Sequence, residues 1–202
     1  MKQFAPATLR NREPILKVLK KILPSEGGIL EISSGTGEHC VYFAPHFPGC
    51  IWIPSDINEG AIASITAWKQ ESGQKNIDYP LMVDVTKPQW YQTFRESQIR
   101  AIVCINMIHI APWDACIGLM AGAGHLLHHG DKLYLYGPYK RNNQHTALSN
   151  EEFDQYLQSQ NRAWGVRNME TVVQTAEKQG LHLQQIIEMP SNNFSLIFEK
   201  QC

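Results

Sequence analysis

The chain has 202 residues, of which 43% are hydrophobic and 18% charged, and its formal net charge is −1. This length suits one α/β domain with a substantial core, expected to span residues 1–202. The chain is nearly neutral and has no runs of lysine or arginine, so its charge does not indicate binding to nucleic acid or to an anionic membrane. We therefore expect a small-molecule partner. The composition carries no indication of oligomeric state.

The cysteines indicate a reducing compartment. They are odd in number and show no C-x-x-C spacing, which predicts reduced thiols rather than a disulfide framework or a zinc site: Cys40, Cys50, Cys104, Cys116 and Cys202. The first residues lack the apolar segment of a signal peptide, and no later stretch approaches about 20 apolar residues. We therefore expect a cytoplasmic protein that does not span a membrane.

The first regular element expected is a helix over residues 14–23. Ile15, Leu16 and Leu19 recur at helical spacing, Pro14 suits a first turn and Pro24 suits a stop. The apolar face of this helix is expected to pack on a sheet.

A glycine-containing loop follows the first predicted strand, residues 29–33. Gly35 and Gly37 can take backbone angles closed to other residues and let a ligand approach the main chain. The helical segment 38–47 comes next, and its N-terminus would present unpaired N–H groups and a positive dipole end. Strand, glycines and helix in this order indicate a nucleoside cofactor, although two glycines after a strand also form ordinary turns.

Acidic residues end the next two predicted strands. Asp56 ends strand 51–56, nineteen residues beyond Gly37, where a carboxylate can accept hydrogen bonds from both ribose hydroxyls. Asp84 lies near the end of strand 80–85, where it could accept from the adenine amino group while Val85 covers the ring. Taken alone, Asp84 reads equally well as a helix cap or a turn former.

The loop favours S-adenosylmethionine over a dinucleotide. A dinucleotide fingerprint places a third Gly or Ala three residues after the second, and that position here is Cys40. A nicotinamide-dependent oxidoreductase is therefore disfavoured. Glu31 would be costly inside a buried parallel strand, so we expect it at the strand end, satisfied by backbone N–H groups or by the ammonium group of the ligand.

Strand-like and helical segments then alternate, with further strands at 99–106 and 132–137 and helices at 58–71 and 112–128. This alternation predicts a doubly wound α/β fold with a mostly parallel sheet. In such sheets the ligand lies outside the carboxyl ends of the strands.

Polar residues interrupt an apolar run after the fourth strand. Asn106 could offer its carbonyl to the methionine portion of the cofactor, and His109 could remove a proton from an attacking nucleophile. His109 could equally be a packed histidine bonded to a backbone carbonyl. Methyl transfer from a sulfonium is an in-line displacement, so a base is optional.

The segment after the fifth strand is the candidate acceptor region. Tyr139 and Arg141 could bind a polar or anionic group of the substrate, although both are also ordinary loop residues. Further residues that could cap the pocket are Asn150, Trp164, Arg167 and Asn192. Trp164 could instead be core, and Asn192-Asn193 the turn of a hairpin.

The last third is expected to hold two helices and a hairpin. Residues 149–152 resemble a capping box that opens a helix, and residues 168–180 form a second helix that ends at Gly180. Residues 181–189 and 194–198 should form a closing hairpin. His125, His128 and His129 lack an acidic partner, so we expect no metal and place them at a solvated helix end.

These motifs together resemble the methyltransferase-like protein 26 family, and the likeness covers nearly the whole chain. Its carriers are residues 6–7, 10–11, 13–16, 30–32, 34–37, 39, 54–56, 104–107, 109, 136–139, 149–150, 153–154, 164–165, 167, 190 and 192–193. Such a dispersed set is far more specific than the glycine loop alone.

The resemblance implies a Rossmann-like class I methyltransferase fold with a seven-stranded sheet whose last strand is antiparallel. It also implies that Arg10 and Asn11, with His39, lie near the cofactor. The chain lacks, after the fourth strand, the Pro-Pro-Tyr motif of many nucleic-acid amino-methyltransferases, which again favours a small acceptor. A shared scaffold does not fix chemistry.

The sequence therefore predicts a methyltransferase that uses S-adenosylmethionine, with His109 and Tyr139 nearest an unidentified acceptor. The alternative is a non-catalytic protein that binds S-adenosylmethionine or S-adenosylhomocysteine as a sensor or interaction partner.

Overall fold

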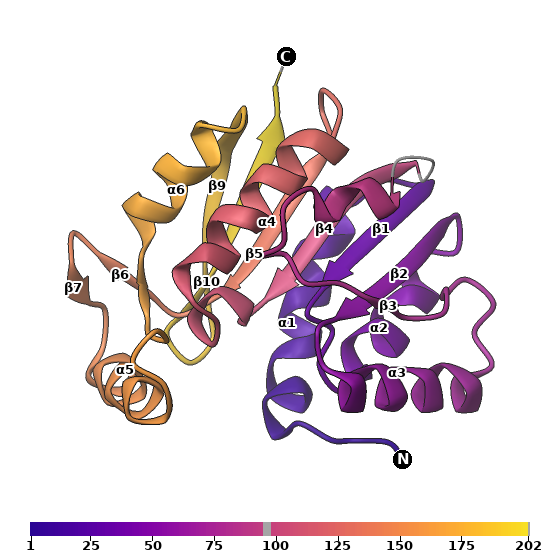
Figure 1. Cartoon of the computed structure of the whole chain (residues 1–202), viewed down its shortest axis with the longest axis horizontal. Helices are drawn as coiled ribbons and strands as arrows, with labels where there is room; N and C mark the ends of the chain where they lie inside the picture. The colour runs from indigo at the N-terminus through magenta and orange to yellow at the C-terminus, as the bar shows by residue number, and fades with distance from the viewer. Residues whose placement is uncertain (95–97, 202) are drawn as a thin grey trace. The chain divides into compact units, whose positions relative to one another are not determined.

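The computed structural model describes residues 1–94 and 98–201 (Figure 1). The chain divides into two compact units. Unit 1 comprises Met1–Asp84 and Phe94–Cys104, and unit 2 comprises Val85–Thr93 and Ile105–Cys202. The expectation of a single domain over residues 1–202 stays a prediction.

The strands confirm the predicted α/β class. One seven-stranded sheet has the order β3-β2-β1-β4-β5-β10-β9. Its strands are β1 (Gly27–Ile32), β2 (Cys50–Asp56), β3 (Leu81–Met82), β4 (Ile99–Ile105), β5 (Lys132–Gly137), β9 (Leu181–Met189) and β10 (Asn193–Lys200). The final strand, β10, runs antiparallel to both of its neighbours, as expected for this fold.

Unit 1 is built around β1, which pairs in parallel with β2 on one side and β4 on the other. Five consecutive residues of β1 are buried, which is the pattern of a strand covered on both faces. The helices of this unit are α1 (Pro6–Ile22), α2 (Glu38–Phe43) with the 3₁₀ turn η1 (Ala44–His46), and α3 (Glu59–Ser72).

Helix α1 begins eight residues earlier than predicted, at Pro6 rather than Pro14. Pro6 occupies the first turn, where its missing N–H is not needed, while Pro14 lies inside the helix. Thr8 and Asn11, which belong to the added turns, are buried. Tertiary packing of these turns therefore outweighs the proline signal that placed the start at residue 14.

Unit 2 contains β5, β10 and β9 with α4 (Trp113–Leu126) and α6 (Met169–Glu177). Ser191 and Asn192 both have positive φ, 58° and 57°, as a tight hairpin turn between β9 and β10 requires. Tyr134 of β5 and Ser195 of β10 are buried and joined by a 2.7 Å hydrogen bond. The predicted helix near 168–180 and the closing hairpin are confirmed.

A second, three-stranded sheet was not predicted. Its strands are β6 (Tyr139–Arg141), β7 (Gln144–His145) and β8 (Arg167–Asn168), in the order β7-β6-β8. Figure 1 labels β6 and β7. Asn142 and Asn143 form the turn between β6 and β7, with φ of 51° and 61°. Strands of two or three residues are too short to show an alternating pattern of apolar and polar residues. The sequence of this stretch therefore predicts a loop.

Two local predictions are wrong. The third predicted strand shrinks to Leu81–Met82, which pair only with the last two residues of β2. The predicted capping box at 149–152 is absent, because α5 (Leu148–Gln160) starts at Leu148 and its N-cap is Ala147, which makes no side-chain cap. Ser149 instead accepts a hydrogen bond from Asn192, 3.1 Å away.

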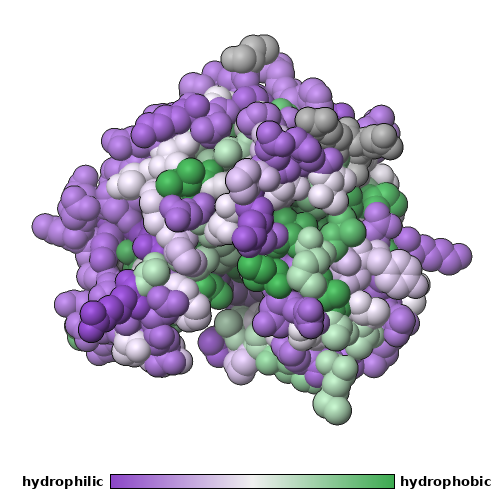
Figure 2. Space-filling model, viewed as in Figure 1, coloured by the Kyte–Doolittle hydropathy of each residue, from purple (hydrophilic) through white to green (hydrophobic). Residues whose placement is uncertain are grey.

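The surface shown in Figure 2 is mainly hydrophilic, with apolar patches between polar regions. No helix among residues 1–94 and 98–201 combines the length and apolar character that crossing a membrane requires. Cys40, Cys50 and Cys116 are buried thiols, and Cys202 lies outside the described residues.

Replacing Pro14 by Ala should stabilise the protein. An interior proline removes one helix hydrogen bond and crowds the preceding turn, so we expect the free energy of unfolding to rise by about 1–3 kcal/mol. Pro6→Ala is the matched control and should change it by less than about 0.5 kcal/mol, because Pro6 lies in the first turn. Urea denaturation measures both, and an unchanged or lower stability of Pro14→Ala would contradict the idea.

Candidate functional site

The glycine loop between β1 and α2 has the backbone that its sequence predicts. Gly35 and Gly37 have positive φ, 58° and 90°, and Ser33 shares this conformation at 58°. A Cβ at Gly37 would lie 2.8 Å from the Cα of Ile65, so only glycine fits there. A Cβ at Gly35 would meet no atom within 4 Å, which leaves space over the loop for a ligand.

Asp56, at the end of β2, holds this loop in place. Its Oδ2 accepts a 2.9 Å hydrogen bond from the backbone N–H of Gly35, and its Oδ1 accepts one of 2.9 Å from the N–H of Asn58. The N–H of Ser34 also donates to the carbonyl of Ser55 at 2.8 Å. A carboxylate offers about four lone-pair sites, so Asp56 retains the capacity to accept from two hydroxyls of a ligand.

Glu31 is buried at the penultimate position of β1, and side chains take the place of the backbone N–H groups that were one of its two predicted partners; the other, the ammonium group of the ligand, stays a prediction. Its Oε2 accepts instead from the indole N–H of Trp52 at 2.9 Å and from the hydroxyl of Ser34 at 3.1 Å. The pKa of Glu31 is raised to about 7, because the effect of burial and, less strongly, the charge of Asp56 outweigh these two hydrogen bonds, which lower it. Glu31 is therefore partly protonated near neutral pH.

The predicted partners Asn11 and His39 lie together beside the loop. His39 Nε2 is 2.9 Å from Asn11 Oδ1, which links α1 to α2, and the imidazole stacks on Phe43 with ring centroids 5.2 Å apart. Burial, with the charge of Arg12, lowers the pKa of His39 to about 4, so the ring is neutral. Arg10 is exposed on α1.

Asp84 and Val85 follow β3. The N–H of Val83 donates to the carbonyl of Asp56 at 3.0 Å, which fixes the path of the chain just before them. Asp84, the last residue of the first segment of unit 1, is half-exposed, and Val85 is buried in unit 2. The contacts of Asp84 and Val85 with adenine therefore remain predictions. The same holds for every other cofactor contact that the sequence predicts.

In unit 2, Asn106 and His109 form a tight turn. Asn106 has a φ of 64° and donates its N–H to the carbonyl of Tyr136 at 2.8 Å, while its own carbonyl accepts from the N–H of His109 at 3.1 Å. The imidazole of His109 meets the ring of Tyr139 edge-on, with centroids 4.9 Å apart. Both side chains are completely buried.

The environment of His109 keeps its ring neutral. Burial, and then the charge of Arg167, lowers the pKa of His109 to about 3. Its Nδ1 accepts from the N–H of Arg167 at 3.4 Å, which leaves the hydrogen on Nε2. Nε2 has no hydrogen-bond partner among the described residues and lies where a Cβ on Gly137 would be only 2.5 Å away. His109 thus presents a buried donor rather than a ready base.

Arg167 ties the turn to its surroundings. Its Nε donates to the carbonyl of Ile108 at 2.9 Å, and its Nη2 donates to the carbonyls of Ala111 and Ala163, both at 2.7 Å. Three backbone carbonyls thereby occupy much of the guanidinium group. Its predicted role in substrate binding stays a prediction, whereas its role in positioning the His109 turn follows from these bonds.

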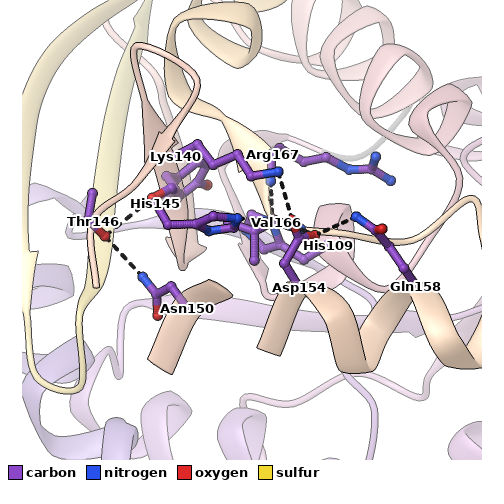
Figure 3. A network of polar contacts seen from close by, with 10 residues as sticks. His109, Lys140, His145, Thr146, Asn150, Asp154, Gln158, Val166 and Arg167 are labelled. Carbon is purple, nitrogen blue, oxygen red and sulfur yellow. Dashed lines mark hydrogen bonds and ion pairs between the residues drawn. The ribbon is translucent and has the colours of Figure 1, made fainter. Parts of the chain in front are cut away.

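Asp154, on α5, is the centre of the polar network in Figure 3. It accepts from Lys140 Nζ at 2.7 Å, from Gln158 Nε2 at 3.1 Å and from the N–H of Val166 at 2.8 Å, and it lies 3.2 Å from His145 Nε2. Burial alone would raise the pKa of Asp154, but the bonds from Lys140, Val166 and Gln158 hold it below its usual value. Neither Lys140 nor His145 was predicted, because single polar residues in a loop carry no pattern.

Of the other predicted substrate-binding residues, two contact each other and two do not take part in this contact. Asn150 is buried and donates to Thr146 Oγ1 at 3.0 Å and to the carbonyl of Asn192 at 2.9 Å, so these two predicted residues do meet. Arg141 is exposed at the end of β6, and Trp164 is half-buried. The structure therefore brings His109, Tyr139 and Arg167 together, and separately Asn150 with Asn192.

Comparison with known proteins supports the fold. A family model described as "Protein of unknown function (DUF938)" matches residues 2–200. An O-methyltransferase family protein from Burkholderia thailandensis is similar over 96% of this chain and 57% of its own, with 10% identity and a TM-score of 0.81. Human N-acetylserotonin methyltransferase, solved in complex with S-adenosylmethionine, is similar over 97% and 53%, with 14% identity and a TM-score of 0.75.

The mitomycin 7-O-methyltransferase MmcR is similar over 96% of this chain and 54% of its own, with 12% identity and a TM-score of 0.78. The chain thus spans a little over half the length of these solved structures. At such low identity the likeness shows a Rossmann-like methyltransferase fold, while the chemistry must be argued from the residues.

Glu31→Gln should change how stability depends on pH. Between about pH 4.5 and 7 the folded protein holds a proton on Glu31 that the unfolded chain has lost, so wild-type stability falls across this window. Relative to the Gln variant, wild type should lose up to about 3 kcal/mol between pH 4.5 and 8.

Urea denaturation of both proteins at several pH values measures this difference. His39 and His109 titrate in the opposite sense, with stability rising toward pH 6.5, but they are present in both proteins and cancel. A stability difference that does not vary with pH would show that Glu31 ionises normally in the fold.

Proposed function

We propose that this chain, which belongs to the DUF938 family of proteins of unknown function, is an S-adenosylmethionine-dependent methyltransferase that acts on a small molecule. The observation that carries the proposal is the bond from the Gly35 N–H to the Asp56 carboxylate, 2.9 Å long, at the carboxyl ends of two adjacent parallel strands. Such an edge is where doubly wound sheets bind nucleosides.

The residues of unit 1 fit the cofactor. Asp56 retains lone pairs for both ribose hydroxyls, and the open space over Gly35 admits a ligand against the backbone. Asp84 would accept from the adenine amino group. Glu31 would face the ammonium of the methionine portion, where a nearby cation would favour its ionised form.

The comparisons support the same class of reaction. The three proteins described above are all named as methyltransferases, and two are named as O-methyltransferases. An oxygen acceptor is therefore part of the proposal. The resemblance to the methyltransferase-like protein 26 family, carried by motifs along most of the chain, points to the same class.

The chemistry asks little of the protein beyond alignment. When bound, the cofactor supplies a methyl group on a positively charged sulfur, which a nucleophile displaces in line. Holding the reactants in line and excluding water supplies much of the rate in such a reaction, so a base with an ordinary pKa is not essential. His109 carries its hydrogen on Nε2 and lies beside Tyr139, so in this proposal it acts as a hydrogen-bond donor and not as a base.

Binding of S-adenosylhomocysteine tests the cofactor site. Isothermal titration calorimetry should show saturable binding to the wild type, and Asp56→Ala should weaken it about 10- to 100-fold, because hydrogen bonds to a charged group are lost. Asp78→Ala is the matched control, since Asp78 is an exposed carboxylate of the same unit. No heat at millimolar ligand, or an Asp56→Ala variant that is folded and binds normally, would refute the assignment.

The second candidate function is a non-catalytic binder of the same cofactor. The burial of His109 and its pKa of about 3 favour this alternative, because the imidazole cannot take up a proton readily. It would retain the cofactor site and respond to the cofactor without transferring its methyl group.

Incubation with methyl-labelled S-adenosylmethionine and a metabolite extract separates the two functions. An enzyme should transfer label to a small molecule, and transfer should fall about 10-fold in His109→Ala, which removes a hydrogen-bond donor, and clearly in Tyr139→Phe. His128→Ala is the control, because the His128 side chain is 86% exposed. If wild type binds the cofactor but labels nothing, the binder is the better description.

A further inference from the structure

Residues 1–5 precede α1 and lie along α3. The N–H of Gln3 donates to Ser64 Oγ at 2.7 Å, and the indole N–H of Trp68 donates to the carbonyl of Gln3 at 3.0 Å. Lys2 Nζ lies 4.2 Å from the Trp68 ring centroid, and Phe4 packs edge-on against the same ring. This segment has no regular structure of its own, so these contacts define its path.

Two buried side chains connect this segment to the glycine loop. Ser64 Oγ, which accepts from Gln3, donates in turn to the carbonyl of Thr36 at 2.7 Å. Glu38 Oε2 accepts both the N–H of Ala5 at 2.6 Å and the hydroxyl of Thr36 at 2.9 Å. Ser64 is 0% exposed and Glu38 is 5% exposed, so water does not replace these bonds easily.

Thr36 is the residue that this arrangement controls. It lies between Gly35 and Gly37, whose backbones are the least restricted in the loop. Ser64 holds the carbonyl of Thr36, and Glu38 holds its hydroxyl. Asp56 holds the neighbouring Gly35 through the Gly35 N–H. The shape of the loop therefore depends on residues 1–5 as well as on the strands.

We propose that residues 1–5 form a strap that positions the cofactor loop, with Ser64 and Glu38 as positioning residues, so that attachment of the strap sets the affinity for the cofactor. This inference rests on the proposed function of the loop. If only the strapped loop binds, detaching the strap lowers the apparent affinity in proportion to the competent fraction. By linkage, the bound cofactor must also hold the strap more firmly.

Gln3→Pro removes the N–H that reaches Ser64 and leaves the loop and α3 unaltered in sequence. It should weaken binding of S-adenosylhomocysteine about 3- to 10-fold, the equivalent of one net hydrogen bond, and Ser64→Ala, which removes the bonds to both Gln3 and Thr36, should weaken it at least as much. Gln3→Ala keeps the N–H and is the matched control, expected to bind like the wild type. Because both changes break the same connection, the double variant should bind no more weakly than Ser64→Ala alone.

Hydrogen exchange supplies a readout that needs no ligand. Gln3→Pro should speed exchange at the amides of Gly35 and Gly37, which bond to Asp56 and to the carbonyl of Ser34, and Gln3→Ala should not. In the wild type, S-adenosylhomocysteine should slow exchange at the amides of Gln3 and Ala5.

The two proposals can fail separately. A wild type that binds no S-adenosylhomocysteine refutes the proposed function, and the strap is then judged by amide exchange in the loop alone. A wild type that binds, together with a Gln3→Pro variant of equal affinity and unchanged loop exchange, overturns the strap. Additive losses in the double variant would also overturn it, because Gln3 and Ser64 would then act independently.

Discussion

The hydrogen bond from the Gly35 N–H to the Asp56 carboxylate is the constraint on which the candidate cofactor site depends. β1 and β2 pair in parallel as far as Ile32 and Ser55, and the residues just beyond each strand continue this connection into the loop. The Ser34–Ser55 backbone bond extends their pairing by one step, and Asp56 then reaches the loop itself. The loop glycines allow many backbone conformations, and the hydrogen bond to the Asp56 carboxylate selects one of them.

The two units use their polar groups differently. In unit 1, the carboxylate of Asp56 accepts the N–H of Gly35, and there is open space above Gly35. Asp56 therefore holds the loop and can still accept hydrogen bonds from a ligand. In unit 2, Arg167 is engaged by three backbone carbonyls and Asp154 by Lys140, Gln158 and Val166. Asp154 is buried and Arg167 half-buried, and a charge removed from water needs such partners, so these groups hold the His109 turn and α5. The residues therefore argue more strongly for a cofactor than for any particular reaction.

The sequence predicts what depends on strong local patterns. The buried strands β1, β2, β4 and β5 and the spacing of Gly37 and Asp56 follow from apolar runs and glycine chemistry, and the structure has them. The start of α1 does not follow, because its first turns are held by distant partners, such as Asn11 with His39, that outweigh an interior proline. The sheet of β6, β7 and β8 also escapes prediction, since two- and three-residue strands have no period to detect.

The hardest feature to read from sequence is the support that a flexible loop receives from outside. Ser64 looks like any serine in an amphipathic helix, and helical serines usually bond within their own helix. Here its hydroxyl instead bonds across to Thr36 and receives the N–H of Gln3, twenty-eight and sixty-one residues away. Besides the bond from the Gly37 N–H to the Ser34 carbonyl inside the loop, this glycine loop receives its supports from elsewhere in the fold. Such supports carry no motif, and only their geometry distinguishes them from ordinary surface residues.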